Sequence, residues 1–177
     1  MSSSRLSLSL LFALALTVAS TGHAAAQQAT TATYDDWVLQ CQTEAATPPQ
    51  PVQKACDMVQ VTQARGSNNP FSRIAILHAV KGQPIKMVVQ VPVNVLLRSE
   101  VHIQASDTDP GIVAPFDRCL PGGCFADFEL KDDIIKKFRA AGAKPGKLTF
   151  KTANGQEIAI PLSFKGFGPA FDALAKD

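Results

Sequence analysis

The sequence predicts an all-β protein, an antiparallel β-sandwich with one or two short helices. About eight short runs of alternating apolar and polar residues follow one another at close spacing. Clusters of Gly, Pro, Asn and Asp separate these runs, as in hairpins. No helical pattern alternates regularly with the strands, which argues against a parallel sheet built from βαβ units.

Residues 1–26 have the pattern of a cleaved signal peptide. Arg5 supplies a positive charge, Leu6 to Ala19 is an apolar run, and small residues end at Ala26. The apolar run is shorter than the roughly 18 residues that a membrane span needs. We therefore expect an exported chain with a flexible tether over residues 27–33, which show no periodicity, and a single domain over residues 34–177.

The charge balance does not indicate a partner. The whole chain has 17 basic and 15 acidic residues, so loss of Arg5 with the signal peptide leaves a formal charge of +1. A nucleic-acid-binding chain would carry a basic stripe, and none is present in the sequence. We expect no nucleic-acid partner and no transmembrane span after cleavage.

All four cysteines lie in the part of the chain that would be exported, where disulfides are the default. Four cysteines allow three pairings. We favour Cys41 with Cys56 and Cys119 with Cys124, because each pair brackets turn-forming residues. Two alternatives remain: a zinc site made by the four thiolates, although the usual C-x2-C spacing is absent, and a redox-active Cys119/Cys124 pair.

In the first half of the domain, alternation predicts four strands. Trp37, Leu39 and Cys41 share a parity, so they lie on one face of the first strand. A second strand covers residues 55–63, and residues 72–80 and 85–91 form a hairpin around a four-residue connection. Pairing Val80 with Ile85 would place His78 opposite Met87. Imidazole and thioether both suit copper, but two ligands do not make a site.

The second half should contain a short strand, two hairpins and two helices. Residues 101–104 form a strand with His102 facing outward. Residues 112–120 and 124–130 form a hairpin, and a disulfide between Cys119 and Cys124 joins its two strands next to the turn. Residues 132–141 form a helix with acids in its first turn and Gly142 as its stop. In the second hairpin, a three-residue loop ending at Gly155 aligns Phe150 with Ile158. Residues 167–174 form a short terminal helix that docks on the sheet.

No catalytic motif is present in the sequence. The chain lacks G-x-S-x-G, H-E-x-x-H, a P-loop and a Gly-rich dinucleotide turn. After cleavage only His78 and His102 remain as histidines, which leaves little material for a nucleophile activated by histidine. We expect no catalytic residue, no cofactor and no metal, and therefore not an enzyme.

Five spaced motifs stand out in the chain: Trp37-x-x-x-Cys41, Cys56-Asp57-Met58-Val59-Gln60, Val91-Pro92-Val93-Asn94-Val95-Leu96-Leu97, Pro115-Phe116-Asp117-Arg118-Cys119-Leu120-Pro121-Gly122-Gly123-Cys124 and Lys165-Gly166-Phe167. Together they resemble the invasion-associated locus B family of exported bacterial proteins, and the resemblance covers essentially residues 34–174. Many relatives have a Pro-x-Gly turn after the paired leucines, where this chain has Arg98-Ser99-Glu100.

The resemblance implies an immunoglobulin-like β-sandwich exported to the periplasm or the cell surface of a Gram-negative bacterium. It implies a part in host-cell invasion for some members, and no established catalytic residue. Our hypothesis is therefore a disulfide-stabilised, non-enzymatic envelope protein that binds a protein or an envelope component. The alternative is a periplasmic redox or metal-handling protein that uses Cys119 and Cys124, or His78 and Met87.

Overall fold

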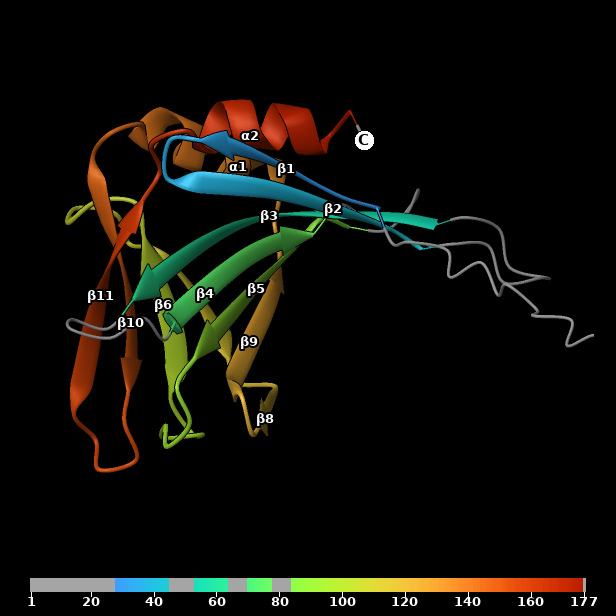
Figure 1. Cartoon of the computed structure of the whole chain (residues 1–177). Helices are drawn as coiled ribbons and strands as arrows, with labels where there is room; N and C mark the ends of the chain where they lie inside the picture. Colours follow the sequence, from blue (N-terminus) through green and yellow to red (C-terminus); the bar gives the residue numbers. More distant parts are fainter. Residues whose placement is uncertain (1–27, 45–52, 64–69, 78–83, 177) are drawn as a thin grey trace, which may run out of the picture.

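The computed structural model describes residues 28–44, 53–63, 70–77 and 84–176. Two antiparallel sheets pack against each other, and two short helices lie at one end of them (Figure 1). The larger sheet contains, in spatial order, β1 (Gln28–Tyr34), β2 (Trp37–Glu44), β3 (Gln53–Gln63), β4 (Pro70–Leu77), β5 (Lys86–Val91), β9 (Gly123–Glu129) and β8 (Arg118–Leu120). The smaller sheet contains β11 (Glu157–Ser163), β10 (Pro145–Lys151), β6 (Glu100–Gln104) and β7 (Ile112–Pro115). The predicted fold class, an all-β sandwich with two short helices, is confirmed.

The first strand, β1, differs from the sequence prediction. Residues 27–33 were expected to form a flexible tether, but β1 pairs with β2 from Gln28 opposite Thr43 to Tyr34 opposite Trp37. The tether prediction used the absence of an apolar pattern. That criterion fails here, because an edge strand rich in threonine is held by ladder hydrogen bonds and needs no buried face. Residues 28–33 are therefore part of the larger sheet.

The expected strand over residues 112–120 is in fact two strands in different sheets. Pro115 ends the pairing of β7 with β6. The N–H of Asp117 then donates to the carbonyl oxygen of Phe125 at 2.8 Å, where pairing of β8 with β9 begins. The chain thus crosses from the smaller to the larger sheet at Phe116. Alternation continues across such a crossing, so the sequence pattern does not reveal it.

The β4–β5 hairpin has a register two residues away from the predicted one. Ile76 pairs with Met87, and Ile74 pairs with Val89. A shift by two residues keeps every side chain on its face, so the apolar pattern fits both registers equally. The predicted placement of His78 opposite Met87 is wrong. Met87 is buried against Ile76, and His78 lies outside the described residues.

The β10–β11 hairpin has the predicted bulged loop. Phe150 lies opposite Ile158 and Leu148 opposite Ile160. Gly155 has a φ of 85°, which is the left-handed conformation that this loop type requires. The loop closes through a hydrogen bond of 2.9 Å from the N–H of Thr152 to the carbonyl of Gln156.

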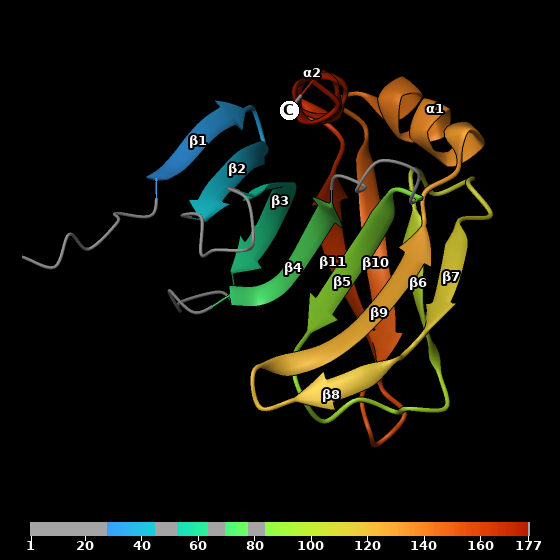
Figure 2. The ribbon, with the colours of Figure 1, turned by 90° about the vertical axis from the view of Figure 1, so that its right-hand side faces the viewer.

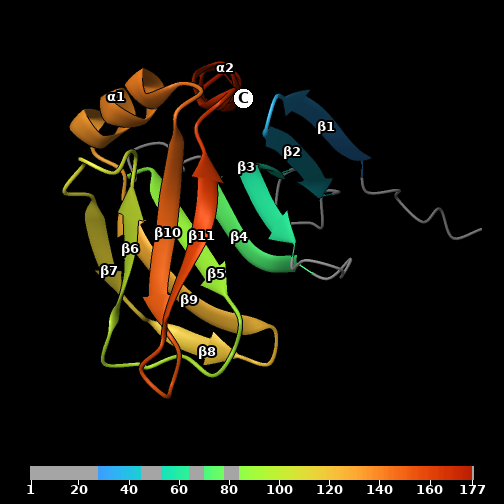
Figure 3. The ribbon, with the colours of Figure 1, turned by 90° about the vertical axis from the view of Figure 1, so that its left-hand side faces the viewer.

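An aromatic cluster joins the two helices to the sandwich. Helix α1 (Asp132–Ala141) ends at Gly142 and helix α2 (Phe167–Leu174) docks as predicted. The ring of Phe167 meets the indole of Trp37 edge-on at 5.5 Å, and Phe138 stacks on Phe164 at 4.6 Å. Figures 2 and 3 show α1 and α2 side by side at the end of the molecule opposite the β8–β9 turn.

Candidate binding surface at the stapled hairpin

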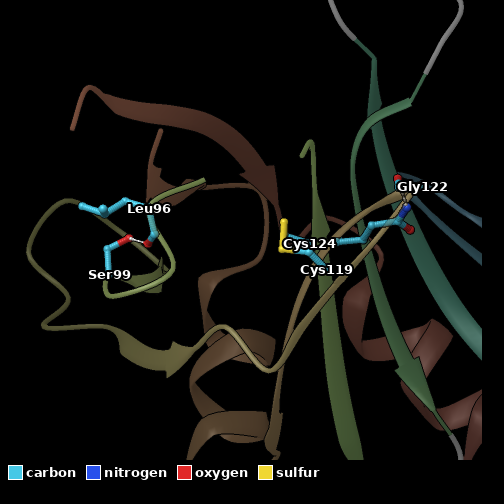
Figure 4. The surroundings of a disulfide bond; sticks show 6 residues. Leu96, Ser99, Cys119, Gly122 and Cys124 are labelled. Atoms are coloured by element: carbon cyan, nitrogen blue, oxygen red, sulfur yellow. Dashed lines mark hydrogen bonds between the residues drawn. A yellow bond between two sulfur atoms is a disulfide. The ribbon is translucent and has the colours of Figure 1, made fainter. Parts of the chain in front are cut away.

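The β8–β9 hairpin stands at the end of the sandwich farthest from the helices (Figures 1 and 2). Leu120 pairs with Gly123, so Pro121 and Gly122 make a two-residue turn. Cys119 and Cys124 face each other directly behind this turn and form a disulfide, with their Cα atoms 4.0 Å apart. Figure 4 shows this bridge beside Gly122. Cys119 is exposed and Cys124 is buried, so the bridge fastens the sheet edge to its interior.

The second disulfide joins Cys41 in β2 to Cys56 in β3, with Cα atoms 4.1 Å apart. Both bridges therefore connect neighbouring strands of the larger sheet, in the pairing that the turn-forming residues favoured. Antibody domains differ, because their conserved disulfide spans the two sheets. All four cysteines are paired as disulfides in this structure.

The hairpin tip is fixed onto β5 by the side chain and backbone of that strand. Gln90 donates a hydrogen bond of 2.9 Å from Nε2 to the carbonyl oxygen of Gly122. Gly123 has a φ of 151°, and a Cβ atom added there would lie 2.6 Å from the carbonyl oxygen of Val91. Only glycine allows this close approach of the hairpin tip to β5.

A groove of about 230 Å³ lies between this tip and the neighbouring ends of β4 and β5. Val93, which lines the groove, and Leu120, which precedes Pro121 in the chain, each expose about half of their side chains. We call Val93, Leu120, Pro121, Gly122 and this groove the hairpin-end surface. The residues that line the groove are Phe71, Ser72, Arg73, Gln90, Val91, Pro92, Val93, Pro121 and Gly122.

The two arginines around the hairpin-end surface are paired with carboxylates. Arg73 contacts Asp57 at 2.6 Å. Arg118 contacts Asp117 at 2.5 Å and Asp127 at 3.5 Å. Its guanidinium also lies over the ring of Phe125, 5.0 Å from the centroid. Because these positive charges are matched locally, the surface is apolar with a neutral polar rim. Such a surface suits a protein partner better than a polyanion.

The segment after β5 contains a turn from Leu96 to Ser99. Both the N–H and the hydroxyl of Ser99 donate to the carbonyl oxygen of Leu96, at 2.8 and 2.7 Å (Figure 4). The N–H of Leu96 donates to the carbonyl of Lys151 in β10 at 2.9 Å. The turn is therefore closed by a serine side chain and tied to the smaller sheet.

The remaining candidate residues do not converge on a chemical site. The Nε2 atom of His102 is 2.9 Å from the carbonyl oxygen of Pro110, within its own hairpin. Asp132 and Asp133 stand in the first turn of α1, as expected for a helix start. Within the described ranges, no three His, Cys, Asp or Glu side chains gather as a metal site would require. No helix in those ranges has the length and hydropathy to cross a membrane.

Sequence reasoning located the hairpin but missed the residues that make it a surface. Val93 was assigned to an irregular passage, and Gln90 was treated only as part of a strand. Neither residue carries a local signal, because their roles depend on β5 lying beside β9. The exposed Leu120 beside a Pro-Gly-Gly turn was the one local indication.

Comparison with known proteins identifies relatives of the whole domain. A family model described as invasion associated locus B (IalB) protein matches residues 37–175. An invasion protein B homologue of Brucella abortus strain 2308 is 30% identical over 144 residues, covering 80% of this chain and 77% of the relative. A homologue from Brucella abortus biovar 1, strain 9-941, matches equally well.

A solved structure supports the fold independently. The crystal structure of invasion associated protein B from Bartonella henselae superposes with a TM-score of 0.68 and 19% identity. It covers 83% of this chain and 96% of the Bartonella chain. With a family match over residues 37–175 and this shared architecture, the chain is a member of the invasion associated locus B family.

Proposed function

We propose that this protein is an exported envelope protein that acts by binding another protein through the hairpin-end surface. The observation that carries the proposal is a pair of exposed apolar side chains at this end of the sandwich, Val93 in the wall of the groove and Leu120 in the disulfide-bridged hairpin. The disulfide and the hydrogen bond from Gln90 hold the tip in place before any partner arrives. A preformed apolar surface loses little conformational entropy on binding, which favours affinity.

Export is the second part of the proposal, and the signal pattern of residues 1–26 supports it. Two disulfides within one domain are typical of an oxidising compartment such as the periplasm or the cell surface. Cleavage after Ala26 would leave all of β1 in the mature chain, because β1 begins at Gln28. The test is mass spectrometry of the chain isolated from the cell envelope. A mature N-terminus at Gln27 is expected, and a chain retained in the cytoplasm with Met1 would contradict export.

The proposed mechanism is binding rather than catalysis, with the partner in the envelope or on a host-cell surface. The Brucella relatives carry the name invasion protein B homologue, which supports contact with a host cell as the role to test first. We further propose that cell entry by a bacterium producing this chain depends on Leu120. If Leu120 is one of the few residues that dominate the interface energy, its truncation should cost about 2 kcal/mol or more.

The experiment is site-specific photo-crosslinking in living cells. A photoreactive residue at Leu120 should form one dominant adduct with a protein, and the same group at Val113 should not. Val113 is a matched control because it is 54% exposed and Leu120 is 52% exposed, but it lies on β7 in the other sheet. Leu120→Asp should weaken partner binding at least tenfold and Val113→Asp should not. Equal adducts at both positions, or none at Leu120, would reject the hairpin-end surface.

A further inference from the structure

The outer edge of β1 is a strand edge without a partner among the described residues. β1 stands at the border of the larger sheet, and none of the described strands pairs with its outer side (Figure 2). Its residues from Ala29 to Thr33 are exposed. We propose that this edge pairs with the same edge of a second copy of the chain, so that the two larger sheets join into one. The inference goes beyond the proposed function and does not depend on the hairpin-end surface.

The other edges of the two described sheets have features that discourage further pairing. β8 has only three residues, and β7 has four and ends at Pro115. β11 contains Pro161, which has no N–H to donate. By contrast, β1 has seven residues and includes neither a proline nor a charged side chain. Among the described edges, β1 is therefore the one most open to another strand.

The strand register shows which backbone groups of β1 point outward. Cys41 and Cys56 lie opposite each other with Cα atoms 4.1 Å apart, which is the short spacing of a pair that exchanges no backbone hydrogen bonds. The N–H and C=O groups of Cys41 therefore point away from β3, toward Thr30 on β1. Backbone direction alternates along a strand, so the N–H and C=O groups of Thr31 and Thr33 point to the open edge.

This edge is complementary to itself. A two-fold axis at Thr31, the middle residue of β1, would set two copies antiparallel, with Thr31 opposite Thr31 and Ala29 opposite Thr33. The outward groups of these residues would then form about six hydrogen bonds between the copies. No like charges would meet, because β1 is uncharged and Asp35 in the following turn is paired with Lys165 at 3.0 Å. Threonine is favoured in strands, and every copy presents the same edge, which is why we name a second copy as the partner.

The first experiment is sedimentation equilibrium of the chain as isolated from the cells that produce it, at concentrations from the micromolar to the millimolar range. Two paired strands of this length bury less than the roughly 1,200 Å² of a standard interface, so the dimer should be reversible. The average mass should therefore rise from one chain toward two as the concentration increases. A chain that stays monomeric up to the millimolar range would overturn the proposal and would leave the edge available to a strand of another protein.

Amide hydrogen exchange locates the contact between the copies. In dilute solution the N–H groups of Thr30 and Ala32, which point to β2, should be protected, and those of Thr31 and Thr33 should exchange freely. In concentrated solution all four should be protected, because the outward N–H groups then bond to the second copy. If Thr31 and Thr33 still exchange freely when the chain is dimeric, pairing through this edge is ruled out.

Variants at the two-fold axis separate backbone pairing from other contacts. Thr31→Pro removes an outward N–H and should weaken dimer formation at least about tenfold, whereas Thr31→Val keeps that N–H and should preserve the dimer. Thr31→Lys sets like charges opposite each other and should also weaken it. Its matched control is Thr108→Lys, which changes an exposed threonine between β6 and β7 and should have no effect. Thermal melts check that each variant is folded. A dimer that persists in both Thr31→Pro and Thr31→Lys would refute the proposal, because the copies would then meet through another face.

Discussion

The side chain of Gln60 forms two hydrogen bonds with the backbone of Ser163 and thereby links the two sheets. Its Nε2 donates to the Ser163 carbonyl at 2.8 Å, and its Oε1 accepts from the Ser163 N–H at 2.9 Å. The same carbonyl accepts from the Trp37 indole at 3.0 Å. Gln60 is on β3 in the larger sheet and is only 8% exposed, and Ser163 is the last residue of β11 in the smaller sheet. The buried amide of Gln60 therefore connects the two sheets by hydrogen bonds.

Gln60→Met should lower the free energy of unfolding by about 1–3 kcal/mol, because the N–H of Ser163 loses its partner in a buried place. Gln42→Met is the matched control: Gln42 is exposed on β2, and the same change there should stay within about 0.5 kcal/mol. Urea unfolding of both variants measures the difference. Equal effects at the two positions would show that the link between the sheets contributes nothing.

The two disulfides should differ in their contribution to stability. The sequence separation is 15 residues for Cys41–Cys56 and 5 for Cys119–Cys124. On the chain-entropy account, a bridge that closes the longer loop restricts the unfolded chain more, with about 3 kcal/mol for the first and about 2 kcal/mol for the second. Double Cys→Ala variants of each pair, compared by urea unfolding, test this order. A larger loss for the Cys119–Cys124 pair would contradict it.

Asp109 should make stability fall in acid. Burial by itself raises the pKa of Asp109, but hydrogen bonds from Lys137 and from the N–H groups of Ala105 and Gly111 outweigh it and hold that pKa below its ordinary value. The unfolded chain then binds the proton first. The stabilisation is complete above the unfolded pKa of about 3.9 and is lost as the pH falls through the lower folded pKa.

Asp109→Asn should therefore lose less stability than the parent chain between pH 6 and pH 3, and should cost about 1–3 kcal/mol at neutral pH. Asp107→Asn serves as the control. The Asp107 side chain is 95% exposed and its contact with Lys147 is 3.4 Å long, whereas the Asp109 side chain is 7% exposed. Unfolding by urea at both pH values gives the comparison. The explanation fails if both variants keep the acid sensitivity of the parent chain.

The two adjacent glycines of the hairpin tip should respond differently to a methyl group. Gly123→Ala should cost about 1–3 kcal/mol, because φ is 151° and the new Cβ would lie 2.6 Å from the Val91 carbonyl oxygen. At Gly122 the nearest atom to such a Cβ is 3.9 Å away, so Gly122→Ala should change stability by less than about 0.5 kcal/mol. Thermal melting of the two variants distinguishes them, and similar melting temperatures would mean that the tip is not held against β5.

Features governed by neighbours in the chain were predictable from the sequence. Phe150 and Ile158 lie on either side of Asn154-Gly155, and only the bulged three-residue loop puts both side chains on one face of the sheet. The sequence therefore predicted the bulged loop. The acids of α1 and Gly142 marked that helix. Turn residues between Cys41 and Cys56, and between Cys119 and Cys124, favoured the two local pairs over the other pairings.

Features governed by distant segments were decided only by the tertiary structure. Side chains alternate between the two faces of a strand, and a register shift of two residues leaves that alternation unchanged. The sequence could therefore assign Ile76 to a face of the sheet, but it could not show that Ile76 pairs with Met87. Ladder hydrogen bonds to β2 ordered β1 without any apolar signal. The hydrogen bonds of the buried Gln60 side chain depend on Ser163 in β11, which follows 103 residues later. Alternation and turn chemistry thus determined which residues face inward. Long-range packing, whose energy is shared among many weak contacts, determined what they meet.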